Sequence, residues 1–373
     1  MKRKIIGVVV LLAVIITAIL TVVGKTKNEP TAGADSKGGT VVVTGVIGSE
    51  KKAFFEDSRV KEVFAANGLE VKVETAGSRD IANKELQGKY DFAFPSSAPA
   101  AEKITAKEKP RTIYSPFYSP MAIASYKPVM ELLAKNGVAS QNDKGVWHIN
   151  MQAYMKLVTD GKKWKELEGA DKLYNSPRSV LINSTDIRKS NSAAMYLALA
   201  SYTLNNDFPV STDVQADKVL PVASKLFLSQ GYSESSSDDP FQNYLSQGMG
   251  AVPMVMIYEA QFVGEAINDA GRISDQMVLA YPEPTVFSKH TLIPITDKAD
   301  KLGSLLLSDP KLVELIAEYG FRPSSNSAVF NKASDENNVA VDKDIINIAN
   351  APSYEMLESM LTKISNEYAS QGK

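Results

Sequence analysis

The sequence predicts an α/β protein preceded by an apolar N-terminal segment. From residue 40 onward, short apolar runs alternate with amphipathic stretches, which is the pattern of strand and helix units. The first three predicted strands each run into a small polar loop, and open parallel sheets bind ligands at such strand ends. With 373 residues, 44% of them hydrophobic and 23% charged, the chain has the length for two domains and the composition of a folded protein.

The N-terminal residues 1–24 differ in kind from the rest of the chain. Basic residues 2–4 precede an uncharged run, 5–24, whose 20 residues would rise about 30 Å as a helix, enough to cross a bilayer. Basic residues before such a run place the chain beyond it outside the cytoplasm. An export signal cleaved at the Ala-Gly-Ala of residues 32–34 is the alternative, but that site lies about ten residues beyond the run. We therefore expect a single-pass protein of the cell membrane, with a flexible tether at 25–38 and an extracellular or periplasmic folded part.

Composition argues against several classes of site. The chain has no cysteine, which excludes disulfides, thiolate nucleophiles and Cys-ligated zinc. Only His148 and His290 are available for a metal site or a Ser-His dyad, and they are far apart in the sequence. The formal net charge is -2 and no long basic patch is present, so we expect no nucleic-acid binding. Because the sequence also lacks G-x-S-x-G, H-E-x-x-H and P-loop motifs, we expect no enzyme, no metal and no cofactor. Paired carboxylates remain open, since 43 acidic residues make chance pairs common.

The first stretch of the folded part carries four predicted strands and two predicted helices. Val71 and Val73 alternate with polar residues, as expected for a strand with one buried face. An amphipathic run ends at Gly68, and glycine commonly terminates helices. In chain order we expect a strand at 40–49, a helix at 51–68, a strand at 69–78, a short helix at 79–88, and strands at 90–100 and 114–128.

The remaining elements alternate in the same way. Met195, Leu197, Leu199 and Leu204 recur among alanines and tyrosines at spacings that suit a buried helix. We expect helices at 128–136, 150–158, 162–168, 190–205, 214–230, 259–271 and 353–366, strands at 179–184 and 251–258, a return pair of strands within 275–296, and a helical segment at 302–323.

Polar residues lie at the carboxyl ends of the first three predicted strands. They are Ser49 after the first strand, Ser78 and Arg79 after the second, and Ser96 and Ser97 after the third. Serines commonly cap helices and turns, which is the alternative for each of them. Because the three loops share one edge of the predicted sheet, we expect them to contribute to a ligand site. The guanidinium of Arg79 could contact a carboxylate or a similar anion through two hydrogen bonds, and an exposed surface arginine is the alternative.

A second group of polar residues precedes the helix predicted at 190–205. The stretch from residue 183 reads NSTDIRKSNSAAMYLALASYTL, and its candidate residues are Thr185, Asp186, Arg188, Ser190 and Asn191. A single helix cap needs fewer polar residues than this, although a cap with solvated charges is the alternative. N–H groups at a helix start suit an anionic oxygen, so we expect this stretch to line a cleft and hold an anionic or strongly polar small molecule.

Tyr258 and Glu259 stand where a predicted strand meets a predicted helix. The tyrosine could offer its hydroxyl to a ligand, so we include both residues among the site candidates. For Glu259 the alternative is a favourable charge at the positive end of the helix. The nearby methionines at 249, 254 and 256 are interpreted as core residues.

Five segments carry a family resemblance through their order and spacing. They read PMAIASYKPVMELL, TDIRKSNSAAMYLAL, GAVPMVMIYEAQFV, YPEPTVFSKHTLIPI and DPKLVELIAEYGFRP. In this order they resemble bacterial extracellular solute-binding proteins of the type II periplasmic-binding fold, the receptor components of ABC importers. The resemblance covers nearly all of residues 40–325. The chain departs from the usual pattern because it lacks a lipobox cysteine and carries the apolar run 5–24.

The resemblance implies two α/β lobes joined by crossover strands, a ligand in the cleft between them, and closure of the lobes on that ligand. Residues 39–125 and 280–373 would form the first lobe, and residues 126–279 the second. An ABC permease as partner follows from the same resemblance. The polar residues named above predict a small polar or anionic solute as the ligand, and we expect the folded part to be monomeric because the N-terminal segment contributes nothing to its α/β core. The alternative is a membrane-tethered ligand sensor, or a stress-resistance or assembly factor, that uses this fold without transport.

Overall fold

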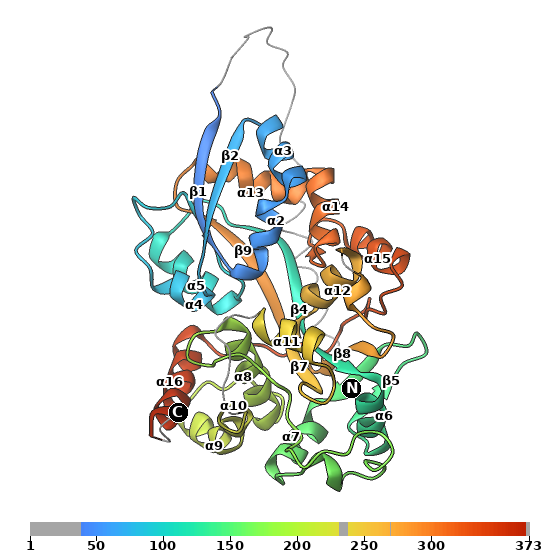
Figure 1. Cartoon of the computed structure of the whole chain (residues 1–373). Helices are drawn as coiled ribbons and strands as arrows, with labels where there is room; N and C mark the ends of the chain where they lie inside the picture. Colours follow the sequence, from blue (N-terminus) through green and yellow to red (C-terminus); the bar gives the residue numbers. More distant parts are fainter. Residues whose placement is uncertain (1–38, 231–237, 269, 371–373) are drawn as a thin grey trace, which may run out of the picture. The chain divides into compact units, whose positions relative to one another are not determined.

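The computed structural model describes residues 39–230, 238–268 and 270–370 of the chain. Contacts divide the chain into two units, Met1–Gly39 and Thr40–Lys373, and the helices and strands that the structure describes belong to the second unit (Figure 1). The predicted membrane segment 5–24 and the tether 25–38 lie outside the described residues. Among the helices that the structure describes, none is both long and apolar enough to span a bilayer.

One long strand, β4 (Tyr114–Tyr126), joins the two parts of a ten-stranded sheet (Figure 1). Its first half pairs with β9 (Phe287–Pro294), which continues into β3 (Phe92–Phe94), β1 (Val41–Ile47) and β2 (Leu69–Thr75). Its second half pairs with β7 (Met254–Tyr258) and β8 (Met277–Glu283), and β8 continues into β6 (Trp147–Asn150) and β5 (Ala139–Gln141). The short β10 (Arg322–Pro323) also pairs with β4.

Strands β1, β2 and β3 are parallel, so their carboxyl ends lie at one edge, as predicted. The return strands predicted within 275–296 exist as β8 and β9. They pair with different halves of β4, so each belongs to a different part of the sheet.

The helices next to the first part of the sheet follow the predicted order with two differences. They are η1 (Ser49–Lys51), α2 (Lys52–Glu56), α3 (Ser58–Ala66), α4 (Ser78–Asn83), α5 (Ala98–Glu108), α13 (Ala299–Ser308) and α14 (Pro310–Glu318). The helix predicted at 51–68 is interrupted because Asp57 is extended and its carboxylate accepts a hydrogen bond from the Arg59 N–H at 2.7 Å, which starts a new helix. Helix α5 differs from the strand predicted at 90–100, because the chain turns into a helix directly after Ser97.

The helices of the second part also deviate from the sequence prediction at several points. They are α6 (Lys127–Lys135), α7 (Met151–Thr159), η2 (Trp164–Glu166), α8 (Asn191–Leu204), α9 (Asp213–Ala223), α10 (Lys225–Leu228), α11 (Asp239–Gln247), α12 (Glu259–Asn268) and η3 (Ala270–Arg272). The helix predicted at 214–230 is divided at Ser224 into α9 and α10. The strand predicted at 179–184 is wrong: Ser179 and Asn183 make only isolated bridges, Asn183 with Val255 of β7. Toward the C-terminus lie α15 (Ser327–Glu336), which the sequence did not predict, and α16 (Tyr354–Ser370).

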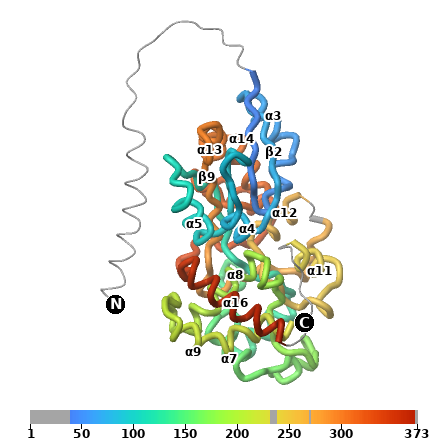
Figure 2. Tube along the Cα trace, turned by 90° about the vertical axis from the view of Figure 1, so that its left-hand side faces the viewer, coloured from blue at the N-terminus to red at the C-terminus, as the bar shows by residue number. Residues whose placement is uncertain are grey.

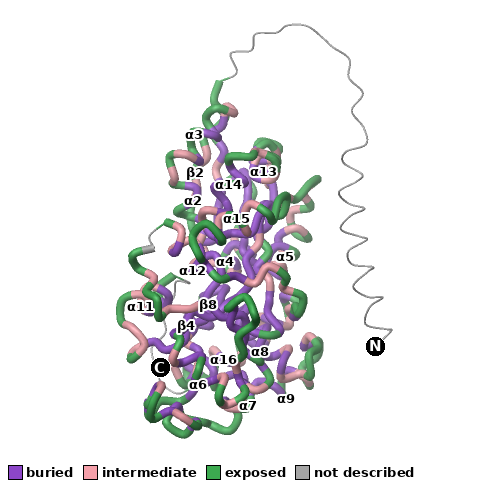
Figure 3. Tube along the Cα trace, turned by 90° about the vertical axis from the view of Figure 1, so that its right-hand side faces the viewer, coloured by how far each residue is buried: buried purple, intermediate pink, exposed green. Residues whose placement is uncertain are grey.

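Buried apolar side chains form three clusters, and the strands around β4 and β8 carry many of the buried residues (Figure 3). The largest cluster surrounds the second half of β4, with β7 and α6 to α12, and α8 is buried nearly all round. The second cluster joins β1, β3 and β9 to α3, α13 and α14, and the third lies between the sheet and helices α4 and α5. Most buried residues of α16 belong to the largest cluster. The division into two lobes by residue range stays a prediction.

Candidate functional site

A cavity of about 400 Å³ lies at the carboxyl ends of β1 and β2 and faces the start of α8. We call it the strand-end cavity, and its lining residues are Gly48, Ser49, Glu50, Thr75, Ala76, Gly77, Ser78, Asp80, Lys189, Ser190 and Asn191. Two groups predicted from the sequence, the loop serines 49 and 78 and the polar residues 190 and 191, therefore meet at one cavity. They lie more than 100 positions apart in the chain.

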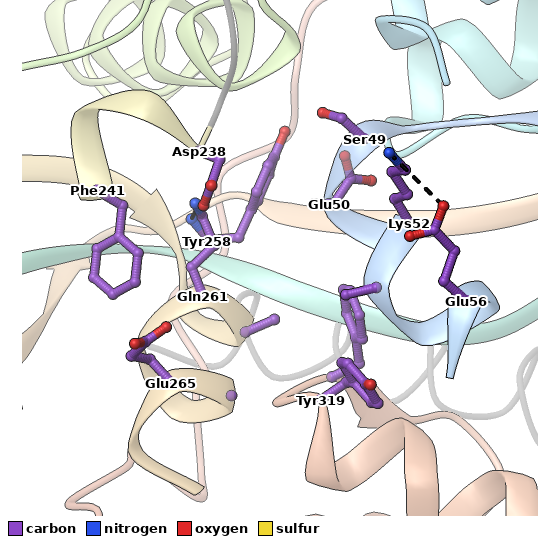
Figure 4. A pocket seen from close by; sticks show the side chains of 14 residues that line it. Ser49, Glu50, Lys52, Glu56, Asp238, Phe241, Tyr258, Gln261, Glu265 and Tyr319 are labelled. Atoms are coloured by element: carbon purple, nitrogen blue, oxygen red, sulfur yellow. Dashed lines mark hydrogen bonds and ion pairs between the residues drawn. The ribbon is translucent and has the colours of Figure 1, made fainter. Parts of the chain in front are cut away.

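A second cavity of about 400 Å³ lies beside the first and includes Tyr258 (Figure 4). Figure 4 shows Ser49, Glu50 and Lys52 on one side of this space, with Tyr258, Gln261 and Asp238 on the other. Apolar contacts come from Phe241, Tyr319 and Phe321. We call it the Tyr258 cavity.

The two cavities share Ser49 and Glu50 in their linings. The side-chain amide of Asn191, in the strand-end cavity, donates a hydrogen bond to the hydroxyl of Tyr258, in the other, at 2.9 Å. Burial raises the pKa of Tyr258 far above its ordinary value, and the charge of Glu50 adds to that effect. The hydroxyl of Tyr258 therefore stays protonated. We refer to the two cavities together as the candidate cleft.

The first turn of α8 has no side-chain cap within the described part of the chain. Ser190 occupies the N-cap position, but its hydroxyl bonds to the hydroxyl of Ser192 at 2.9 Å, which in turn lies 2.8 Å from the Thr185 hydroxyl. The N–H groups that begin the helix are thus left for another acceptor, and the helix dipole favours a negative or oxygen-rich one.

Asn191, the first residue of α8, carries a further unsatisfied group. Its side chain is nine-tenths buried, with 6% of the residue exposed, and its Oδ1 has no hydrogen-bond partner among the described residues. The Ser184 hydroxyl, seven positions earlier in the chain, also has no hydrogen-bond partner among the described residues, but Ser184 lines neither cavity. Buried polar atoms normally have partners, so unpaired ones beside a cavity indicate where a bound molecule or water completes the bonding.

Beneath the shared wall of the two cavities lies a buried cluster of charged and polar side chains. The ammonium of Lys51 lies 2.6 Å from Glu50 Oε1, 2.6 Å from the Ser96 hydroxyl and 3.0 Å from Nδ1 of His290. The Ser96 hydroxyl also donates to Glu50. Lys51 and His290 are both fully buried.

Electrostatics in this cluster favour an ionised Glu50 and a neutral His290. Burial alone would raise the pKa of Glu50, but the charge of Lys51, together with hydrogen bonds from Lys51 and Ser96, lowers it to about 2. Burial lowers the pKa of His290 well below its ordinary value, and the neighbouring Lys51 lowers it further. The pKa of Lys51 is also lowered by burial, against the opposing attraction of Glu50. The neutral imidazole can therefore accept a hydrogen bond from the ammonium.

Sequence reasoning missed Glu50, Lys51 and His290 as parts of this region. Glu50 and Lys51 directly follow the predicted residue Ser49, so their place at the end of β1 was an available signal. His290 was not recognisable, because 239 positions separate it from Lys51.

The two arginines proposed as anion ligands are engaged with protein groups. Arg188 forms a bidentate ion pair with Asp186, its partner from the same loop, and 43% of its side chain is exposed. Arg79 pairs with Glu358 of α16 and also donates to two backbone carbonyls, those of Ile187 and Arg188. Neither arginine lines the two cavities.

The other predicted residues lie near the candidate cleft without lining it. Ser97 is the buried N-cap of α5. Glu259 is fully buried and pairs with Arg322 through bonds of 2.6 and 2.7 Å, and it also accepts a hydrogen bond from Tyr281. Within the described residues, no group of three or more acidic residues or histidines is arranged to hold a metal ion.

No family model and no curated protein sequence matches this chain. Solved structures do match it. An ABC transporter solute-binding protein from Thermotoga lettingae bound with α-D-tagatose has a TM-score of 0.56 at 15% identity, over 87% of this chain and 93% of that one. The chain has the fold of periplasmic solute-binding proteins. This confirms the resemblance inferred from the sequence.

Two further structures share this periplasmic-binding fold. Iron-bound HitA from Pseudomonas aeruginosa has a TM-score of 0.55 at 10% identity, over 87% of this chain and 99% of that one. The periplasmic binding protein AfuA from Actinobacillus pleuropneumoniae, with fructose-6-phosphate bound, has a TM-score of 0.53 at 11% identity, over 90% of this chain and 98% of that one. At these identities the likeness establishes the fold and leaves the ligand to be argued from the site.

Proposed function

We propose that the chain is the extracytoplasmic solute-binding component of an ABC-type transport system, and that it holds a small polar or anionic solute in the candidate cleft. The observation that carries the proposal is the start of α8, where an uncapped helix end and the unpaired Oδ1 of Asn191 face one cavity. A fold shared with solute-binding proteins supports it. A volume of about 400 Å³ is within the range of small-ligand sites, about 300–1,000 Å³.

The polar groups of the cleft limit the chemistry of the solute. The N–H groups of α8 need an acceptor oxygen, and Oδ1 of Asn191 is an acceptor that needs a donor. The ionised Glu50, which lines both cavities, is a further acceptor. At the rim, the exposed charges of Lys189 and Asp80 are of opposite sign. A solute with hydroxyl groups satisfies both requirements, and an oxyanion that retains a proton does so as well.

The membrane anchor at 5–24 completes this proposal. Its length and the basic residues 2–4 support a protein held at the outer face of the cell membrane. In this proposal the two lobes, residues 39–125 with 280–373 and residues 126–279, close on the solute. Such a tether would keep the binding protein close to a permease in the same membrane.

The direct experiment is mass spectrometry of small molecules carried by the protein purified under native conditions. A bound solute should also raise the free energy of unfolding, by about 2.7 kcal/mol at a hundredfold excess over its dissociation constant. A protein that carries no solute and is not stabilised by a panel of sugars, sugar phosphates and oxyanions would contradict the proposal.

Variants of two asparagines on α8 locate the site once the solute is identified. Asn191→Ala should weaken binding about tenfold, because it removes a hydrogen bond to the solute. Asn205→Ala is the matched control, since Asn205 lies at the opposite end of the same helix and bonds to the Phe208 carbonyl. Equal affinities of the two variants in calorimetry would show that the start of α8 is only a helix end.

A further inference from the structure

Helix α16 is shared between two of the apolar clusters. Tyr354, its first residue, is buried in the cluster of α4 and α5, together with Ile81 and Ile104. Further along, Leu361 and Ile364 are buried in the largest cluster, with α8 and α9. Figure 2 shows α16, in red, passing α8, and the helix contacts α5, α8 and α9. One helix therefore connects the elements on both sides of the strand-end cavity.

Polar contacts anchor both ends of this helix. At its start, the Tyr354 hydroxyl accepts a hydrogen bond from Asn83 of α4 at 3.0 Å, and Lys103 of α5 lies 4.2 Å from the centre of the tyrosine ring. Near its end, the Tyr368 hydroxyl donates to the carbonyl of Phe227 at 2.7 Å. The two ends are thus bound to different parts of the fold.

Arg79 lies where α4, α16 and the loop before α8 meet. Its Nη2 donates to Glu358 Oε2 at 2.7 Å, and its Nε donates to the other oxygen of that carboxylate. Its Nη1 donates to the carbonyls of Ile187 at 3.2 Å and Arg188 at 3.1 Å. Only 16% of the Arg79 side chain is exposed, and its contacts with Glu358 and Ile187 are partly buried, whereas the contact with the Arg188 carbonyl is exposed.

These contacts join the two walls of the strand-end cavity. Arg79 directly follows Ser78, which lines one wall, and the carbonyls that it binds directly precede Lys189, which lines the other. The walls are already in close approach at Gly77, where a Cβ atom would lie 3.3 Å from the Lys189 carbonyl oxygen. A guanidinium suits this position, because its planar set of N–H donors can bond to a carboxylate and two carbonyls at once.

We propose that Arg79 is a positioning residue that, together with α16, holds the two walls of the strand-end cavity at a set separation before any solute binds. Helix α16 packs against both apolar clusters, and Arg79 links Glu358, in the middle of α16, to the loop that leads into α8. Any effect of this arrangement on the affinity for a solute rests on the proposed function, whereas its effect on the separation of the two walls does not.

The test measures wall separation without ligand. The chain has no native cysteine, so spin labels can be placed at Lys89→Cys and Lys218→Cys. Both positions are exposed, the first shortly before β3 and the second on α9, which contacts α8. Distances between the labels by pulsed electron resonance, and hydrogen exchange of residues 187–192, are compared among variants. Arg79→Ala should shift the distances to longer values with a broader distribution, and exchange at 187–192 should be about tenfold faster.

Two more variants make the result decisive. Arg59→Ala is the matched control, because Arg59 also pairs with carboxylates, those of Asp57 and Glu318, but lies away from the cavity walls. It should leave the distances and the exchange unchanged. Glu358→Ala removes one partner of Arg79 from a partly exposed position on α16 and should reproduce part of the Arg79→Ala effect even if the latter variant folds poorly. Distances and exchange in Arg79→Ala and Glu358→Ala that match those of Arg59→Ala would overturn the proposal, whatever solute the protein binds.

Discussion

Replacing Lys51 with methionine should destabilise the protein by about 3–5 kcal/mol at pH 7 and by less at pH 4. Lys51 is 0% exposed, and its ammonium lies 2.6 Å from the carboxylate of Glu50, whose side chain is 9% exposed. Without the ammonium, the carboxylate would be left with the Ser96 hydroxyl as a donor and with Nδ1 of His290 at 3.6 Å, neither of which carries a compensating charge in the native protein. Removing one partner of a buried pair is costly because the remaining charge has lost its compensation.

The dependence on pH follows from the pKa of Glu50. In the native protein, burial raises this pKa, but the charge of Lys51 and the hydrogen bonds from Lys51 and Ser96 lower it more, to about 2 from 4.5. A carboxyl with a lowered pKa stabilises the fold fully above pH 4.5, and the contribution is lost as the pH falls from 4.5 to about 2. The difference corresponds to about 3 kcal/mol. In Lys51→Met, burial acts without the lysine charge, so the pKa of Glu50 should rise above 4.5 and the group should be neutral at pH 4.

Urea unfolding at pH 7 and pH 4 provides the measurement. The native chain should keep its full Glu50 contribution at pH 7 and most of it at pH 4, whereas the loss in Lys51→Met should shrink at pH 4. The double variant Glu50→Gln/Lys51→Met is the control, because it removes both charges and should recover much of the loss at pH 7. Equal losses for Lys51→Met at both pH values, or a loss below about 1 kcal/mol at pH 7, would refute the assignment of a buried ion pair.

Three further results are expected. Arg322→Met should lower the free energy of unfolding by about 3–5 kcal/mol in urea titrations, because it leaves the fully buried Glu259 without its cation. A loss no larger than that of an exposed ion pair would contradict the prediction. The polypeptide from residue 37 to 373 should fold as a monomer, measured by light scattering, because Thr40–Lys373 forms its own compact unit. The full-length chain should stay with membranes. Its release by alkaline carbonate would show that residues 5–24 are not an anchor. The protein should show no hydrolytic turnover, and activity that survives repurification but disappears in a point variant would contradict this expectation.

The sequence determined those features that depend on neighbouring residues. Strands β1, β2 and β7 and the start of α8 lie where periodicity and capping residues predicted them, because side chains two to four positions apart decide which face of an element is apolar. The same local signals indicated that Ser49, Ser78 and Asn191 stand at element ends. Local signals were weakest where elements are short, as at the break on Asp57.

Tertiary structure alone decided which of these ends meet and how their charges are compensated. The sequence allowed Arg79 to be interpreted as an anion ligand, whereas the fold brings it to Glu358, 279 positions away. Likewise, it places His290 against Lys51 across 239 positions. No periodicity records such pairs, because they arise from the way strands from distant parts of the chain assemble around β4. The local sequence thus indicates which residues are of a type that can bind a solute. The burial, ion pairing and pKa of these residues depend on contacts that exist only after the chain has folded.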